Sequence, residues 1–221
     1  MTLLLRGAFC ASLLALVAGC CANSTNTCDD LYADSLYFKL KAKPDNSTDK
    51  SYFSAAELDT VYLQRYTPAH PATQPNGITP GTPAAPATYS DPVSIIRAKQ
   101  NISLNSGLRA HLRQAGFSDA DTLLIISNNS PFSPSTTGGK LSAYHYLLTV
   151  QNKPVRPGQT YQFDLDSIQL KGQYNANSCT TCYQNTFKYF DINKGKAKGE
   201  VTEKDGKPIA TLLSKNEANS K

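Results

Sequence analysis

Thr160-Tyr161-Gln162-Phe163-Asp164-Leu165-Asp166-Ser167-Ile168-Gln169-Leu170 is the stretch that decides the fold, because apolar and polar residues alternate along it. Tyr161, Phe163 and Leu165 therefore fall on one side of an extended chain, as in a half-buried strand. Residues 143–150 alternate in the same way, and the Asn, Pro and Gly of residues 151–158 suit a hairpin connection. The pair predicts an antiparallel sheet with one face against a core.

Outward from this pair, further short segments rich in apolar and aromatic residues predict strands. They lie at residues 31–42, 60–66, 93–97, 122–126 and 186–192, with 207–213 as a candidate for the last one. Residues 107–116 have one short helical face that ends at a Gly. Many short strands between turn residues predict an all-β fold. We expect a single antiparallel β-sandwich, immunoglobulin- or transthyretin-like, with one short helix, over residues 31–193.

Two segments differ in composition from the predicted sandwich. Residues 67–92 hold seven prolines among 26 residues, mixed with Ala, Thr and Gly, which predicts a long, extended and mobile loop. Residues 194–221 are rich in Lys with acidic residues interspersed, which predicts a solvated C-terminal extension with room for one last strand. Before the strand at 60–66, Ser54 and Glu57 have the spacing of a single capped turn.

The first 20 residues have the pattern of a secretory signal. Met1 and Arg6 precede an apolar and small-residue stretch over residues 7–19, which is shorter than the about 20 apolar residues that a membrane-spanning helix needs. Its end, Leu16-Val17-Ala18-Gly19-Cys20, resembles the lipobox of bacterial lipoproteins.

The lipobox resemblance implies where the chain resides. Residues 1–19 would be removed by type II signal peptidase, Cys20 would carry the lipid, and residues 20–30 would form a polar spacer. Two or more acyl chains hold a protein firmly, at about 0.8 kcal/mol per buried CH₂. Residue 21 is Cys and not the Asp that retains some lipoproteins in the inner membrane, so we expect the outer membrane, with the leaflet left open.

Four cysteines remain once the signal segment and Cys20 are set aside: Cys21, Cys28, Cys179 and Cys182. An even number in an oxidising compartment favours disulfides. Residues three apart in an extended chain lie about 10 Å apart, which disfavours a mutual Cys179–Cys182 bridge. A bridge from the first two to the last two would close a loop of roughly 150 residues, worth on the order of 4–5 kcal/mol in the chain-entropy model.

Cys179-Thr180-Thr181-Cys182 also has two alternative interpretations. A redox-active CxxC lies at a helix N-terminus, whereas the flanking residues here are strand-like. A zinc ribbon needs a second CxxC, and Cys21 and Cys28 do not supply one. A structural disulfide is therefore the prediction, with thiol-disulfide chemistry and metal binding as the alternatives.

The sequence predicts no catalytic residue, metal ligand or cofactor. It holds no Gly-x-Ser-x-Gly elbow, phosphate loop or dinucleotide fingerprint, and His70, His111 and His145 are scattered. The net charge is +5, and the lysines near the C-terminus alternate with acids instead of forming a dense patch with Arg and aromatic residues. Nucleic acid is therefore not an expected partner.

The pattern Asp-[Ser/Thr]-apolar occurs at four places, with hydroxyls at Ser35, Thr60, Thr122 and Ser167. It resembles the O-glycosylation signature of exported Bacteroidetes proteins, which implies these four hydroxyls as acceptors. Turns that lead into strands favour the same residue types.

A second resemblance concerns Phe53 with residues 57–63, Tyr144-His145-Tyr146, residues 160–168 and Cys179-x-x-Cys182-Tyr183. These features are similar to those of small Bacteroidetes lipoproteins, which implies a β-rich extracytoplasmic fold. We expect a non-enzymatic binding or accessory module of the bacterial envelope, held to the membrane through Cys20, with an envelope protein or a glycan as partner. The alternatives are an envelope thiol-disulfide protein that uses Cys179 and Cys182, or a glycan-handling surface protein.

Overall fold

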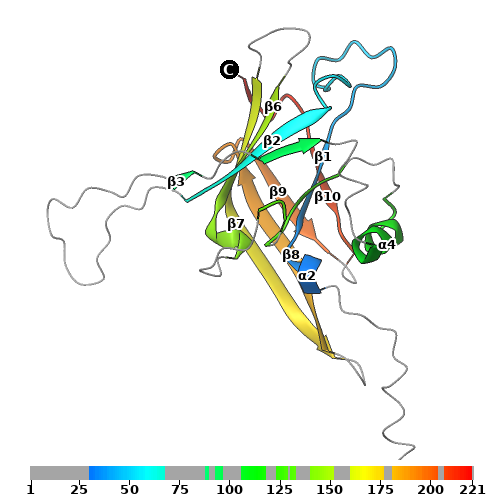
Figure 1. Ribbon diagram of the computed structural model, residues 1–221, viewed down its shortest axis with the longest axis vertical. Helices are drawn as coiled ribbons and strands as arrows, with labels where there is room; N and C mark the ends of the chain where they lie inside the picture. The colour runs from blue at the N-terminus through cyan, green and yellow to red at the C-terminus, as the bar shows by residue number, and fades with distance from the viewer. Residues whose placement is uncertain are drawn as a thin grey trace, which may run out of the picture.

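The computed structural model describes residues 30–67, 88–89, 93–96, 106–117, 123–128, 130–132, 140–151, 160–176, 181–203 and 207–220. Its elements are α2 (Asp30–Ala33), β1 (Leu36–Leu40), β2 (Thr60–Thr67), β3 (Thr88–Tyr89), β4 (Val93–Ile96), α4 (Ser106–Gln114), β5 (Leu123–Ile126), η1 (Leu141–Ala143), β6 (His145–Gln151), β7 (Thr160–Ala176), β8 (Thr181–Ile192), β9 (Ala197–Thr202), β10 (Ala210–Leu213) and β11 (Asn219–Ser220). Two sheets share one core, which confirms the predicted all-β sandwich (Figure 1).

The larger sheet is built around the strand pair that the alternating pattern predicts. It has eight strands, six of them in the order β3-β2-β6-β7-β8-β9, while β4 pairs with β2 and β11 with β7. Strands β6 and β7 are antiparallel, with Leu148 opposite Phe163. Both of these side chains are fully buried, because the apolar positions of the alternation face the second sheet.

The smaller sheet has three strands in the order β10-β1-β5. Strand β1 pairs antiparallel with β5 and parallel with β10, so residues from both ends of the described chain lie side by side. Helix α4 covers the outer face of this sheet: Leu108 and Leu112 pack against Tyr37, Leu123 and Ile125. The predicted helix at 107–116 thus adds a third layer beside the sandwich (Figure 1).

The main core lies between the two sheets. The smaller sheet contributes Leu36, Phe38, Leu40, Leu124, Ile126 and Leu213, and the larger contributes among others Val61, Leu63, Tyr146, Phe163, Leu165, Phe190 and Ile192. Aromatic rings connect the layers, because Phe38 and Phe190 meet edge to face with ring centroids 5.2 Å apart.

The C-terminal region differs from the predicted extension over residues 194–221. Strands β9, β10 and β11 all pair with the sheets, and Leu213 and Ala218 are buried in the core. Exposed lysines and acids alternate with buried residues along these strands, so a charged composition that suggested a solvated extension belongs to paired strands. Residues 1–29 lie outside the described residues, as does most of the predicted Pro-rich loop, of which Thr67 ends β2 and β3 pairs with β2.

Strands β7 and β8 continue past the rest of the larger sheet as a two-stranded ribbon, which extends away from the sandwich in Figure 1. We call residues 172–176 and 181–185 the arm; they pair from Gly172 opposite Asn185 to Ala176 opposite Thr181. An extra residue in β7 after Asp166, with Ser167 at a φ of 53°, shifts the register where the strand leaves the core.

Candidate functional site

Lys188 of β8 is buried between the layers, with a side chain that is 2 % exposed. Its Nζ donates hydrogen bonds to Glu203 Oε1 at 2.7 Å and to the carbonyl oxygen of Ser35 at 2.7 Å. The same Nζ lies 5.3 Å from the centre of the Tyr37 ring. Burial lowers the pKa of Lys188, and the charge of Glu203 opposes that shift. The ion pair lies within the larger sheet, because Glu203 directly follows β9, the neighbour of β8. The hydrogen bond to the Ser35 carbonyl group joins Lys188 to the start of the smaller sheet and leaves the amine enclosed.

Asp34 and Asn185 extend this buried polar cluster toward the arm. The Asn185 amide donates to the Asp34 carboxylate and, at 2.7 Å, to the carbonyl oxygen of Ala33. Asn128 donates to the other Asp34 oxygen at 3.2 Å. Among the described residues, Ser35 Oγ and Asn185 Oδ1 are buried without a hydrogen-bond partner. These contacts fix α2 and the start of β1 onto β8 at the base of the arm, where Asn185 is opposite Gly172.

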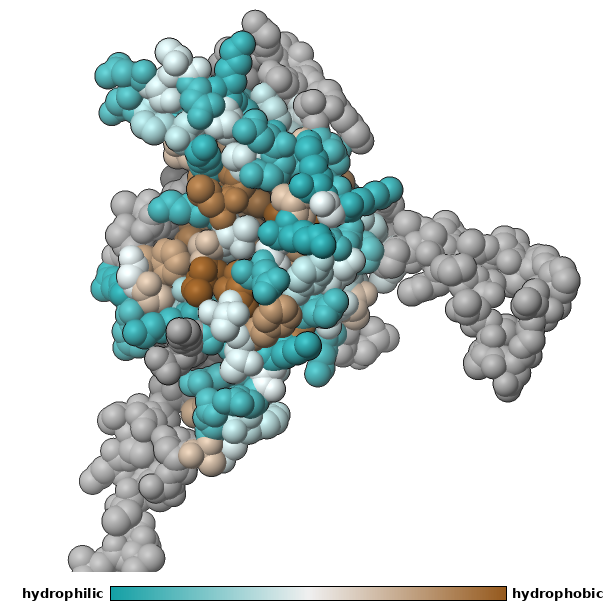
Figure 2. Space-filling model, turned by 180° about the vertical axis from the view of Figure 1, so that it is seen from behind, coloured by the Kyte–Doolittle hydropathy of each residue, from teal (hydrophilic) through white to brown (hydrophobic). Residues whose placement is uncertain are grey.

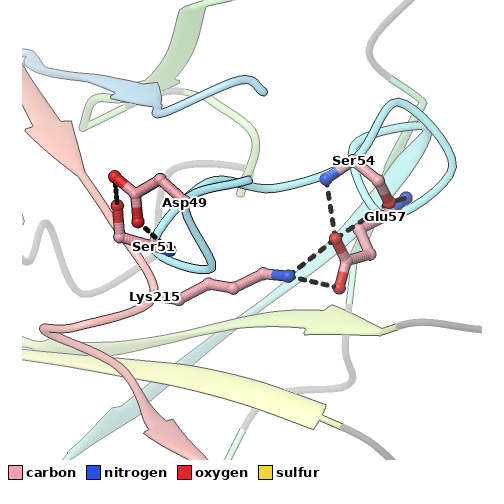
Figure 3. Close-up of polar contacts among 5 residues, drawn as sticks. All are labelled: Asp49, Ser51, Ser54, Glu57 and Lys215. Atoms are coloured by element: carbon pink, nitrogen blue, oxygen red, sulfur yellow. Dashed lines mark hydrogen bonds and ion pairs between the residues drawn. The ribbon is translucent and has the colours of Figure 1, made fainter. Parts of the chain in front are cut away.

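A second cluster joins the capped turn to the C-terminal region (Figure 3). Glu57 accepts hydrogen bonds from the Ser54 backbone N–H at 2.7 Å and from the Ser54 hydroxyl at 2.9 Å, while Ser54 Oγ accepts from the Glu57 N–H, which confirms the predicted cap. Lys215 Nζ lies 2.8 Å from Glu57 Oε1 and 4.7 Å from the Tyr161 ring centre. Although burial opposes it, hydrogen bonds from Lys215 and Ser54 lower the pKa of Glu57.

A third polar group lies where β2, β6 and β7 run side by side. The Tyr66 hydroxyl donates to Asp164 Oδ1 at 2.5 Å, and the Tyr66 ring meets the His145 ring edge to face at 5.2 Å. Among the described residues, no group of three His, Cys, Asp or Glu side chains is suited to hold a metal ion.

Tyr174 lies in the arm and has the most exposed large hydrophobic side chain among the described residues, at 72 %. Its ring centre lies 5.2 Å from that of Tyr183, the residue opposite it on β8. A Cβ at Gly172 would lie 2.6 Å from the Tyr183 hydroxyl oxygen, so Gly172 lets that ring fold against the ribbon. Burial, followed by the charge of Asp34, raises the pKa of Tyr183.

The remaining arm side chains are mostly amides. Asn175 donates to Gln184 Oε1 at 2.7 Å and accepts from Gln173 at 3.2 Å, and all of these contacts are exposed. The lower extension in Figure 2, seen from behind, is mainly teal and white, whereas brown apolar residues lie in the middle of that face. Beyond Tyr174, the exposed large apolar side chains of the described residues are Ile209 and Leu212, both in or next to β10.

The hydroxyl groups that the sequence predicts as glycosylation sites differ in their exposure to solvent. Ser35 is fully buried, so a glycan on its hydroxyl would not fit between the layers. Thr60 and Ser167 each donate a hydrogen bond to the preceding carboxylate, at 3.0 Å to Asp59 and 2.8 Å to Asp166. Ser167 is exposed at the β7 bulge. Thr122 lies outside the described residues.

The cysteine predictions fall largely outside the described part of the chain. Cys182 lies in β8 opposite Asn175, half-buried in the arm, and it is disulfide-bonded. The predicted lipidation site Cys20 and the disulfide candidates Cys21, Cys28 and Cys179 lie outside the described residues, so the pairing of the cysteines and the lipid remain predictions. No helix among the residues that the structure describes is long and apolar enough to span a bilayer.

Sequence reasoning missed the buried Lys188–Glu203 pair, although a signal exists for it. Lys188 shares the period-two face of Phe190 and Ile192, and Glu203 shares that of Val201, so each charge occupies a core-facing position. Opposite charges at two such positions indicate an internal ion pair.

Comparison with protein-family models, with curated proteins and with solved structures finds no match for this chain.

Proposed function

We propose that the chain is a non-enzymatic, lipid-anchored binding module of the bacterial envelope, and that the arm is the part that meets its partner. The observation that carries this proposal is the exposure of Tyr174 on a ribbon that extends beyond the sandwich. Tyrosine is enriched at protein interfaces because it combines a large apolar ring with a polar tip. A ring exposed to 72 % gains from a contact that covers it.

The buried charges support a binding role over a catalytic one. Lys188 is enclosed by Glu203 and the Ser35 carbonyl group, and Glu57 is held by Lys215 and Ser54. These groups have the shifted pKa values that often mark active sites, but here the shifts arise from contacts that join one element to another.

The lipobox motif at residues 16–20 supports the anchor, and the outer membrane is the destination that we propose. Cys20→Ala tests this part: the protein should stay unprocessed or leave the membrane fraction. Cys21→Ala is the matched control, and it should be processed and fractionate as the parent does. Unchanged processing and fractionation of Cys20→Ala would contradict the proposed anchor.

A photo-crosslinking amino acid in place of Tyr174 tests the binding role. In intact cells it should give a defined cross-linked product, whereas the same probe at Leu212, an exposed residue of the smaller sheet, should not. Absence of any product at residue 174 would contradict a binding role for the arm.

The second candidate is a thiol-disulfide protein, and the observation that favours it is the position of Cys182 in the projecting arm. Alkylation and mass mapping separate the two. Bridges from Cys21 and Cys28 to Cys179 and Cys182 that resist mild reductant support the binding module, while free thiols at Cys179 and Cys182 support redox chemistry. A glycan-handling protein is the third candidate, and a glycan cross-linked at residue 174 would support it.

A further inference from the structure

Along the arm, none of the described strands pairs with the outer edge of β7. Strand β6 pairs with β7 only from Thr160 to Leu165. From Gln169 to Ala176, β8 on the other side is the sole partner of β7 among the residues that the structure describes. A row of backbone N–H and C=O groups on such an edge can pair with another strand.

The arm carries neither charge nor proline, two of the usual protections against strand addition. Proteins blunt exposed edges with charged residues, above all Lys, and with proline. The sequence from Gly172 to Phe187 contains no charged residue and no proline, although 18 % of the whole chain is charged. Lys171 and Lys188 flank this stretch, so the charges stop where the arm begins.

We propose that the occupant of this edge is a second copy of the chain, whose arm adds antiparallel along β7 to form a continuous four-stranded ribbon about a two-fold axis. A strand that fits this edge must itself be extended, uncharged and open on one side, and the arm meets each of these conditions. In a two-fold contact the same patch meets itself, so the absence of charge removes the repulsion that like charges would cause there.

The geometry of the arm agrees with this pairing. An isolated two-stranded ribbon is marginally stable in water, and additional strands stabilise it. The exposed Tyr174 would come close to its counterpart across the two-fold axis, which covers part of a ring that is now 72 % exposed. Two lipid-anchored copies on one membrane would also meet at a raised effective concentration. The inference rests on the proposed function, because it names what the arm binds.

The test uses the full-length, lipid-anchored chain. Two copies with different affinity tags are produced together, each with the photo-crosslinker at residue 174, and purification through one tag is followed by detection of the other. We expect a cross-linked pair of the two tagged copies, and sedimentation of the parent protein in mild detergent should show a dimer. The matched control carries the probe at Leu212 and should give no pair.

A second test places a charge on the edge of β7 and measures self-association. Tyr174→Lys places two like charges across the axis and should weaken self-association on the order of tenfold or more. Leu212→Lys adds the same charge on the smaller sheet and should leave the dimer intact. Both variants should retain the parent circular dichroism spectrum, because both side chains are exposed.

The outcomes separate this inference from the proposed function. Cross-linking at residue 174 only to a different protein or to a glycan would overturn the second copy and leave a binding role for the arm. No product at all would overturn both. A pair that forms equally well from the Leu212 probe, or a monomer by sedimentation at every concentration, would overturn the self-pairing.

Discussion

Gly199 of β9 lies opposite Phe190 of β8, and the ring of Phe190 covers the place where a side chain at residue 199 would start. A Cβ built on Gly199 would lie 2.0 Å from Phe190 Cζ. Phe190 in turn meets Phe38 of the smaller sheet edge to face. The absence of a side chain at residue 199 therefore allows an aromatic contact that joins the two sheets.

Gly199→Ala should lower the free energy of unfolding by about 1–3 kcal/mol, the usual cost of overpacking a core. The new methyl group would displace the Phe190 ring and loosen its contact with Phe38. Urea unfolding followed by circular dichroism measures the loss. Glu200→Ala, at the exposed neighbouring position of β9, is the control and should change stability by less than about 0.5 kcal/mol. Equal stability of the two variants would argue against the packing role of Gly199.

Lys188→Met should destabilise the fold by about 3–5 kcal/mol, because it leaves the buried Glu203 carboxylate without its cation. The double variant Lys188→Met/Glu203→Leu should recover most of the loss, since an apolar pair of similar volume avoids the burial of two charges. A double-mutant cycle on urea unfolding measures both effects. Single and double variants of equal stability would show that Lys188 and Glu203 are not coupled energetically.

Glu57 predicts a loss of stability in acid. Its pKa in the folded protein lies below its ordinary value of 4.5, so the folded state favours the ionised form. This contribution to stability is complete above 4.5 and is lost as the pH falls through the folded pKa. Glu57→Gln should therefore be less stable than the parent at neutral pH, and the difference should shrink on acidification. Urea midpoints over this range measure it, and a constant difference would contradict the assignment.

Of the three O-glycosylation candidates that the structure describes, Ser167 is the one with an exposed side chain, at the bulge. Ser167→Gly suits the positive φ there and should remove one glycan mass from the protein purified from its own host. Ser35→Ala is the control, since Ser35 is buried and should carry no glycan. Intact mass spectrometry tests both; an unmodified Ser167 would leave the Asp-Ser-Ile pattern as turn chemistry alone.

The alternating pattern was sufficient to predict the sandwich but not how it closes. Strands β6 and β7 follow their sequence pattern because each has one buried face. The parallel pairing of Phe38 with Thr211 has no local signal, since it joins distant parts of the chain. The arm was hidden for another reason. The extra residue near Ser167 changes the phase of the alternation, and the polar residues that follow resemble a loop although they form a strand.

In the candidate site, too, the sequence predicted the local contacts but not those between distant parts of the chain. The cap at Ser54 and Glu57 depends on residues three apart, and its spacing was sufficient to predict it. Lys215 comes to that cap from the far end of the fold, so its ion pair with Glu57 depends on tertiary structure alone. The arm as a binding element likewise needs the strand pairing, because the same neutral residues in a loop would carry no open edge.

The position of β1 between β5 and β10 has a consequence for the order of folding. Strand β1 is made before both of its neighbours, and its parallel partner comes close to the end of the described chain. The smaller sheet can therefore close only after residue 213 has been synthesised, and contacts of such long sequence separation slow folding. Until β10 has been synthesised and has paired with β1, the unfinished chain would expose Leu36, Phe38 and Leu40. Premature termination should therefore produce an aggregation-prone species and not a smaller folded domain.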